Sequence, residues 1–331
     1  MTICNAALAD NSQAIVCIAD KGISYGENIQ WDSDSSKIIR LGLRNIVVMI
    51  AGMDSHITRF LSPILAIEDQ LGKDATETIR LCEAEYKKAY DELIEINFLK
   101  PKLVTKEEYL EGITGDKVNV FFRSLLNEID AFQVNCALLL CGFDDKRKPF
   151  LISLTKPGIA TDYAINGFHA IGTGCEKAIS KILYSGFKRS NSVERIFYDC
   201  FDAKAFAEMD PTIGYDWDAK IVTADKIWEV PSPTCKLVEQ VWTKYNRSPF
   251  EKREPDDMKN PPRDWREQLS AFFSRMTGRV PHGKARELRI NGSTAADKPI
   301  SKSSKKLRAK LRKLVRKNTK RLGAQKSKRG Q

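Results

Sequence analysis

Histidine is scarce in this sequence, with only His56, His169 and His282 among 331 residues. No two of these histidines have the spacing of ligands to one metal ion, so a metal site built on histidine is not expected. The eight cysteines are scattered along the chain, without the CxxC pairs that zinc sites and redox motifs use. We therefore expect reduced, mostly buried thiols, and neither a metal nor another cofactor.

Long apolar runs are also missing from the sequence. No stretch reaches the roughly 18 consecutive apolar residues that a membrane-spanning helix needs. The first residues, MTICNAALADNS, lack a cationic start and place Asp10 where a signal peptide would be apolar. We therefore expect a cytoplasmic protein without a transmembrane segment or a secretion signal.

Acidic residues are absent from the last part of the chain. Residues 301–331 contain 14 of the 54 Lys and Arg, whereas residues 1–300 contain the other 40 together with all 43 Asp and Glu. The net charge of +11 therefore comes from a basic tail on a slightly acidic body. Apolar residues recur in this tail at helical spacing, at Leu307, Leu311, Leu314 and Val315. Such a tail predicts an anionic partner (nucleic acid, an acidic protein or a membrane surface), and the alternative is a solvated tail that is helical only when bound.

Along the first 229 residues the spacing of apolar side chains changes between two periods. Apolar residues at every second position predict strands, whereas spacings of three and four predict helices. Strands are predicted at 3–9, 14–19, 38–42, 46–51, 134–141, 149–154, 159–165 and 218–224. Helices are predicted from Asp54, at 75–97, 117–133 and 174–186, and from Asn191, with Glu194 in a capping box. The polar segment from Asp20 to Ser36 is predicted to be a loop, and the first four strands an antiparallel meander.

The order of these elements bears on the fold class. Helices grouped between runs of antiparallel strands predict an α+β fold, a four-layer α/β/β/α sandwich of two antiparallel sheets flanked by helices, over residues 1–229. A Pro-Ser-Pro break at 231–233 and four prolines within 247–264 then predict a partly helical extension and linker over 230–300, rich in proline and charge. Residues 301–331 form the basic tail.

Three residues form a candidate catalytic set: Thr2 behind Met1, Asp20 at the end of the second predicted strand, and Lys37 before the third. A hydroxyl is a poor nucleophile unless a base accepts its proton. The α-amine of an N-terminal threonine serves as that base once Met1 is removed. A nearby ammonium keeps the pKa of the amine near neutrality, and a carboxylate holds the ammonium in place. Lys37 and Asp20 are the residue types that this chemistry needs.

Short segments around these residues carry a wider resemblance. They are Thr2-Ile3, Ile18-Ala19-Asp20, Ser36 to Leu41, Val47 to Gly52, Ala170 to Gly174, and Asp210 with Gly214. In order and spacing they resemble the proteasome β-subunits and the HslV-type peptidases, within the N-terminal-nucleophile hydrolases, over about residues 2–228. Ile213 stands where the proteasome has an assisting serine, which the HslV type also lacks.

The resemblance implies roles for further residues. Thr2 is the implied nucleophile, with Lys37 and Asp20 beside it. The N–H of Gly52 would contribute to the oxyanion hole, and Thr173 and Asp210 would support the amine. Ile50 aligns with the base of the substrate side-chain pocket, which implies an apolar preference.

The same resemblance implies a threonine-type endopeptidase that cleaves peptides or unfolded proteins inside a self-compartmentalising homo-oligomeric ring. A separate ATPase unfoldase would supply substrates, because this sequence has no phosphate-binding glycine-rich loop. The alternative is a catalytically inactive proteasome-like scaffold that keeps Met1 and whose basic tail binds nucleic acid or an acidic partner. A third hypothesis is a small-molecule amidase of the same superfamily.

Overall fold

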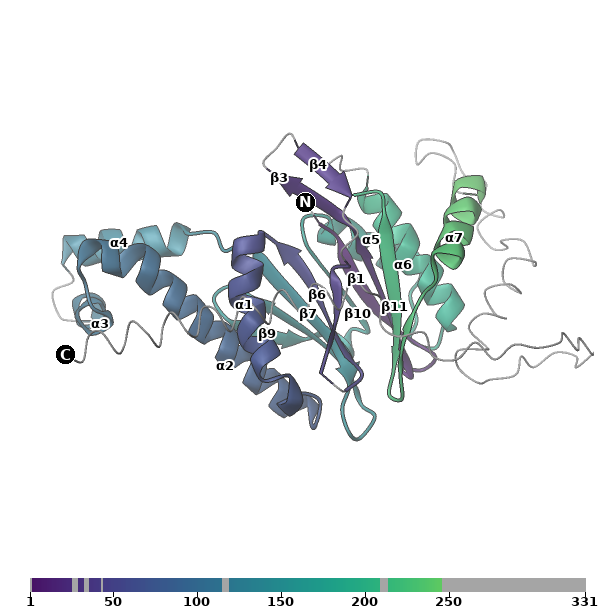
Figure 1. Ribbon diagram of the computed structural model, residues 1–331, viewed down its shortest axis with the longest axis horizontal. Helices are drawn as coiled ribbons and strands as arrows, with labels where there is room; N and C mark the ends of the chain where they lie inside the picture. Colours follow the sequence, from purple (N-terminus) through teal and green to yellow (C-terminus); the bar gives the residue numbers. More distant parts are fainter. Residues whose placement is uncertain are drawn as a thin grey trace, which may run out of the picture.

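The computed structural model describes residues 2–25, 29–32, 36–42, 44–114, 119–208 and 214–245 (Figure 1). The predicted tail 301–331 and most of the predicted extension 230–300 lie outside the described residues. The start of that extension is described and is helical: α7 (Ser232–Tyr245) begins within the Pro-Ser-Pro sequence at 231–233.

Two antiparallel sheets of five strands each form the centre of the described chain (Figure 1). The first sheet has the order β10 (Phe168–Ile171), β1 (Cys4–Ala9), β2 (Ala14–Asp20), β11 (Trp217–Thr223), β12 (Ile227–Glu229). The second sheet has the order β5 (Ile38–Leu41), β6 (Ile46–Gly52), β7 (Cys136–Phe143), β8 (Pro149–Thr155), β9 (Ile159–Asp162). Together with the helices, these sheets confirm the predicted α+β class.

The predicted meander of the first four strands is wrong, because β1 and β2 belong to one sheet and β5 and β6 to the other. Alternation along a strand determines which side chains share a face, but not which sheet the strand joins. The predicted loop from Asp20 to Ser36 is also incorrect. It contains a two-stranded hairpin of β3 (Gly22–Tyr25) and β4 (Ile29–Asp32), whose short alternating runs are separated by polar residues.

Seven α-helices are described. They are α1 (Asp54–Ala66), α2 (Ala75–Ile94), α3 (Lys106–Thr114), α4 (Val120–Ala131), α5 (Cys175–Tyr184), α6 (Val193–Ala207) and α7. The capping box predicted from Asn191 and Glu194 is wrong, because the side chain of Ser192 accepts a hydrogen bond from Arg195 N at 3.4 Å, which places Arg195 rather than Glu194 at the third helical position. Ser192 therefore is the N-cap of α6, and Asn191 lies outside the helix.

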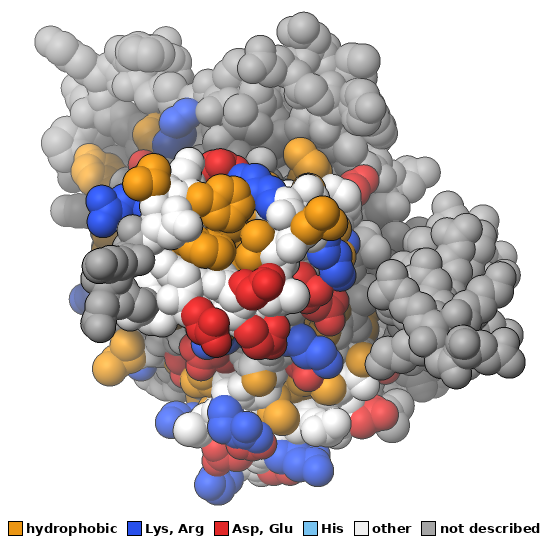
Figure 2. Space-filling model, turned by 90° about the vertical axis from the view of Figure 1, so that its left-hand side faces the viewer, with side chains coloured by type: hydrophobic (Ala, Val, Ile, Leu, Met, Phe, Trp, Pro, Cys, Tyr) orange, Lys and Arg blue, Asp and Glu red, His pale blue; other side chains and the backbone are white. Residues whose placement is uncertain are grey.

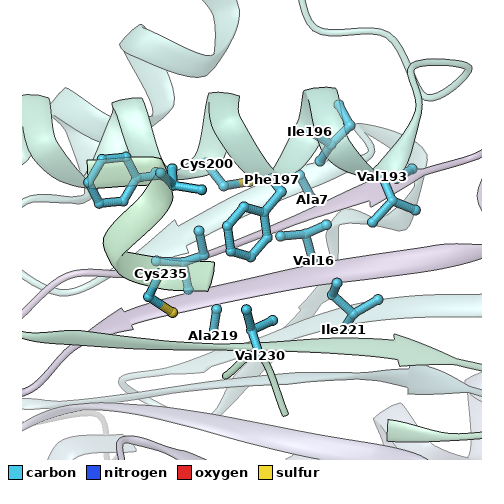
Figure 3. Packing of buried hydrophobic residues seen from close by; sticks show 14 of the residues in the cluster. Ala7, Val16, Val193, Ile196, Phe197, Cys200, Ala219, Ile221, Val230 and Cys235 are labelled. Atoms are coloured by element: carbon cyan, nitrogen blue, oxygen red, sulfur yellow. The ribbon is translucent and has the colours of Figure 1, made fainter. Parts of the chain in front are cut away.

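Apolar side chains fill the space between the two sheets and on the outer face of each. The cluster between the sheets includes Leu8, Cys17, Met49, Leu139 and Leu151. On the first sheet, Phe197 and Cys200 of α6 and Cys235 of α7 pack against strand residues such as Val16 and Ala219 (Figure 3). Strands β1 and β2 are buried along their whole length, and their sequences are apolar on both faces except at Asn5 and Asp20.

On the second sheet, α1 and α2 supply the outer cover. Phe60 of α1 stacks on Tyr86 of α2 with ring centroids 4.3 Å apart, and both side chains are buried. The Tyr86 hydroxyl donates a hydrogen bond of 2.9 Å to the carbonyl of Cys136 in β7. This bond satisfies the buried phenol and ties α2 to the sheet.

An appendage of short helices extends from the end of α2 (Figure 1). It consists of the π-helical turn η2 (Glu95–Leu99), the 3-10 turn η3 (Lys100–Lys102), α3 and α4, and it has its own small core around Leu99 and Leu125. Leu103 and Val120 on its surface are 92% and 83% exposed. Figure 2 shows this end of the molecule, where apolar side chains gather above a group of acidic ones. Nothing in the sequence pattern predicted α3.

Candidate active site

Thr2, Asp20 and Lys37 come from three chain segments that meet at one end of the two sheets. Thr2 and Ile3 precede β1, which pairs with β2 so that Asp20, the last residue of β2, lies beside them; Asp20 N donates to Ile3 O at 3.1 Å. Lys37 precedes β5 of the other sheet, and its carbonyl accepts a hydrogen bond of 3.1 Å from Ile50 N in β6. The candidate set therefore joins the two sheets.

The Lys37 ammonium is the centre of this arrangement. Its Nζ lies 2.9 Å from Thr2 Oγ1 and 3.0 Å from both carboxylate oxygens of Asp20. It also donates to the carbonyl of Gly22 at 2.6 Å. An ammonium has three protons, so the hydroxyl, the carboxylate and the carbonyl account for all of them. The charge is thereby fixed beside the Thr2 hydroxyl.

The Asp20 carboxylate is fully buried. Besides Lys37, three backbone N–H groups donate to it, from Ile3 at 2.8 Å, Gly22 at 3.0 Å and Gly214 at 3.3 Å. A buried carboxylate is tolerated when it is paired and hydrogen-bonded in this way. These donors hold Asp20 in one orientation, and Asp20 in turn holds Lys37.

The backbone around Thr2 is closely packed. The Thr2 side chain is 8% exposed, and its carbonyl accepts a hydrogen bond of 3.5 Å from Gly174 N in the turn before α5. Gly172 in that turn has a φ of +96°, and a Cβ built there would lie 2.2 Å from the Thr2 carbonyl oxygen. Only glycine permits this approach, and the turn fixes the position of Thr2.

The other predicted residues are placed as follows. Gly52 ends β6 with a φ of +131° and is exposed, and Ile50 two residues earlier is half-buried against the core under α1 and α2. Thr173 is exposed in the turn before α5 and, within the described residues, makes no hydrogen bond with Thr2. Asp210 lies outside the described residues.

Cys4 is another potential nucleophile close to the site, two residues after Thr2. Burial raises the pKa of its thiol, and the positive charge of Lys37 only partly opposes that shift. Its Sγ lies 3.5 Å from the carbonyl oxygen of Ile50. Because the reactive form of cysteine is the thiolate, Cys4 does not compete with the Thr2 hydroxyl.

Two glycines contribute backbone contacts to the Asp20 and Lys37 pair: Gly22, which was not singled out in the sequence, and Gly214, which was named there without a role in the site. The available signal for Gly22 was its position two residues after the strand-end aspartate, where a carboxylate commonly accepts a backbone N–H. Within the described ranges, no three or more His, Cys, Asp and Glu side chains form a group that could hold a metal ion. In the same ranges, no helix combines the length and apolar character needed to cross a membrane.

Replacing Gly172 by alanine is expected to destabilise the protein strongly and to displace Thr2. The new Cβ would clash with the Thr2 carbonyl in addition to the cost of a positive φ. Gly186→Ala is the matched control, since Gly186 has a φ of +73° with nothing within 4 Å of an added Cβ. We expect the control to lose about 1 kcal/mol of unfolding free energy in urea titrations. Equal losses in the two variants would contradict the tight contact with Thr2.

No protein-family model and no curated protein sequence matches this chain. Among solved structures, the chain is similar to eukaryotic HslV from Trypanosoma brucei, with 15% sequence identity and a TM-score of 0.41. That similarity covers 67% of this chain and 99% of the HslV chain.

Proposed function

We propose that this protein is a threonine-type peptidase of the N-terminal-nucleophile kind, in which Thr2 becomes the nucleophile after removal of Met1. One observation supports this proposal more than any other: a single ammonium, Lys37 Nζ, contacts both the Thr2 hydroxyl and the Asp20 carboxylate, at 2.9 and 3.0 Å. The two five-stranded sheets and their helices would then form the four-layer α/β/β/α sandwich of such enzymes.

In the proposed first step, Thr2 Oγ1 attacks the carbonyl carbon of the scissile amide. Its proton passes, through a water molecule, to the free α-amine of the same residue, which therefore acts as the general base. The Lys37 ammonium stabilises the negative charge that develops on Oγ1. Asp20 keeps that ammonium in place, so little reorganisation is needed when the charge forms.

The tetrahedral intermediate carries its negative charge on the former carbonyl oxygen. The N–H of Gly52 is the proposed donor to this oxyanion, and one such donor contributes about 3 kcal/mol in other enzymes. When the intermediate collapses, the C–N bond breaks and the protonated α-amine of Thr2 returns its proton to the leaving amine. Water then hydrolyses the ester on Thr2, again with the amine as base, and releases the carboxylic acid.

Supporting roles follow the same proposal. Thr173 and Asp210 would support the α-amine of Thr2, and Ile50 would line the base of the pocket for the substrate side chain. An apolar residue at that position favours substrates with apolar side chains on the acyl side of the cleaved bond.

The proposed substrates are peptides and unfolded proteins, cleaved in the cytoplasm inside a homo-oligomeric ring. Residues 1–229 would form the catalytic domain of each subunit, and a separate ATPase would unfold the substrates. The extension 230–300 and the basic tail 301–331 would be accessory, with the tail bound to an anionic partner.

The experiment that tests this proposal is an intact mass measurement before and after exposure to a threonine-directed β-lactone or epoxyketone. We expect a mass without Met1 and a single adduct per chain, located on Thr2 by peptide sequencing. Protein denatured before exposure is the control and should gain no adduct, since the reaction depends on the folded site. A retained Met1 together with no adduct would instead support the inactive scaffold.

A further inference from the structure

A buried lysine close to the candidate site takes no part in the proposed chemistry. Lys204, in the last turn of α6, has a side chain that is only 1% exposed. It donates to the carboxylate of Glu208 and, at 2.6 Å, to the carbonyl of Tyr215. Burying an ammonium is costly unless its partners are fixed, so both contacts need to be held well.

The two partners of Lys204 stand on either side of residues 209–213. Glu208 directly precedes this segment, and Tyr215 lies one residue beyond Gly214, which follows it. One ammonium therefore fixes the chain where it enters and where it leaves the segment. It sets the distance between the end of α6 and the start of β11.

Gly214 connects this clamp to the candidate active site. Its N–H lies 3.3 Å from Asp20 Oδ2, the same oxygen that accepts the N–H of Gly22 at 3.0 Å. A Cβ built on Gly22 would lie 2.6 Å from Gly214 Cα, so the two glycine backbones are in direct contact. Because no free space remains between Gly22 and Gly214, a shift of the Tyr215 carbonyl would also displace Gly214.

We propose that Lys204 is a positioning residue for the active site. By holding Tyr215 and Glu208, it keeps the Gly214 N–H on Asp20, and Asp20 keeps Lys37 beside Thr2. The catalytic part of this inference rests on the proposed function, whereas the placement of Gly214 on Asp20 does not.

The charges around Glu208 agree with this role. Burial raises the pKa of Glu208, Lys204 opposes that shift, and the charges of Glu239 in α7 and Asp20 add to it. Lys204 is thus the cation that offsets the effect of burial and of the neighbouring carboxylates on Glu208.

A second lysine, largely enclosed between α5 and α6, provides a control. Lys181 of α5 forms an ion pair of 3.0 Å with Asp202 of α6, and the two side chains are 11% and 12% exposed. Asp202 also accepts a hydrogen bond of 2.9 Å from Trp242 Nε1 in α7. This pair links α5 to α6, and Trp242 joins α7 to it.

The test compares Lys204→Met with Lys181→Met in the full chain, with stability recorded for each variant by thermal unfolding. For Lys204→Met, we expect kcat for a peptide substrate to fall about tenfold or more at unchanged KM. Hydrogen exchange of the Gly214 amide should accelerate by a similar factor. For Lys181→Met, we expect a comparable loss of stability, with kcat and Gly214 exchange within about twofold of wild type.

Equal kcat and equal Gly214 exchange in Lys204→Met and Lys181→Met would overturn the inference. If Lys204→Met does not fold, Glu208→Gln replaces it, because it keeps the size of the side chain and removes the charge that Lys204 pairs with. An unchanged Gly214 exchange rate in that variant would also overturn the inference. If the wild type neither cleaves peptides nor gains an adduct, the proposed function fails, and Gly214 exchange still decides whether Lys204 holds Gly214 on Asp20.

Discussion

Thr2→Ala is expected to abolish peptide hydrolysis and adduct formation, with kcat falling by about 10⁴-fold or more. The variant removes the only hydroxyl that contacts Lys37 Nζ among the described residues. Folding should change little, because alanine fits the space of threonine and the Asp20 contacts of Lys37 remain. The measurement is the rate of hydrolysis of a fluorogenic peptide, together with intact mass after electrophile treatment and a thermal unfolding curve.

Thr2→Ser is the matched control for this result. Serine keeps the hydroxyl and the α-amine and loses only a methyl group, so we expect it to form the adduct and to hydrolyse peptides at a measurable rate. The pair of variants thus isolates the hydroxyl from the rest of the side chain. Hydrolysis by Thr2→Ala at the wild-type rate would show that the nucleophile is a different group.

Asp20→Ala is expected to abolish activity and also to lower the free energy of unfolding by about 3–5 kcal/mol. The loss of the carboxylate removes the anionic partner of the largely enclosed Lys37 ammonium, and three buried backbone N–H groups lose their acceptor. Lys37 is then free to turn away from Thr2. Urea unfolding gives the loss in stability, and intact mass after electrophile treatment shows whether the site still reacts.

Asp74→Ala is the control for removal of a hydrogen-bonded aspartate. Asp74 caps α2 by accepting from Thr76 N and Glu77 N, and it pairs with Lys146 on the surface. We expect a much smaller loss of stability and unchanged adduct formation, because water replaces these contacts. Similar losses in the two aspartate variants would contradict the view that buried contacts of Asp20 hold this end of the protein together.

Part of the candidate site could be predicted from the sequence, because its chemistry requires particular residue types. An N-terminal hydroxyl nucleophile needs an ammonium and a carboxylate nearby, and these residue types predict the set of Thr2, Asp20 and Lys37. In the structure, the Lys37 ammonium lies 2.9 Å from the Thr2 hydroxyl and 3.0 Å from the Asp20 carboxylate. Strand positions were also readable, since alternation and apolar runs depend on neighbours in sequence. Both kinds of inference rest on local physical constraints.

Contacts between distant segments could not be read in the same way. The contact of Gly214 with Asp20 joins residues 194 apart, and nothing near either residue indicates the other. Lys204 looks like a surface lysine at the end of an amphipathic helix until the packing of Tyr215 and Glu208 encloses it. The assignment of strands to two sheets could not be predicted for the same reason, because strand pairing depends on segments far apart in the chain.

The cysteines of this protein are poorly accessible to thiol reagents in the folded state. Seven of the eight are buried and Cys175 is partly buried, and burial raises the pKa of Cys82, Cys136 and Cys235 to about 12. In the native state, thiol reagents therefore meet one accessible sulfur at most, and that sulfur lies outside the described contacts of Thr2. Cysteine labelling of the intact fold therefore has almost no background, and the time course of alkylation of the seven buried cysteines reports how often the sheets and helices around them open.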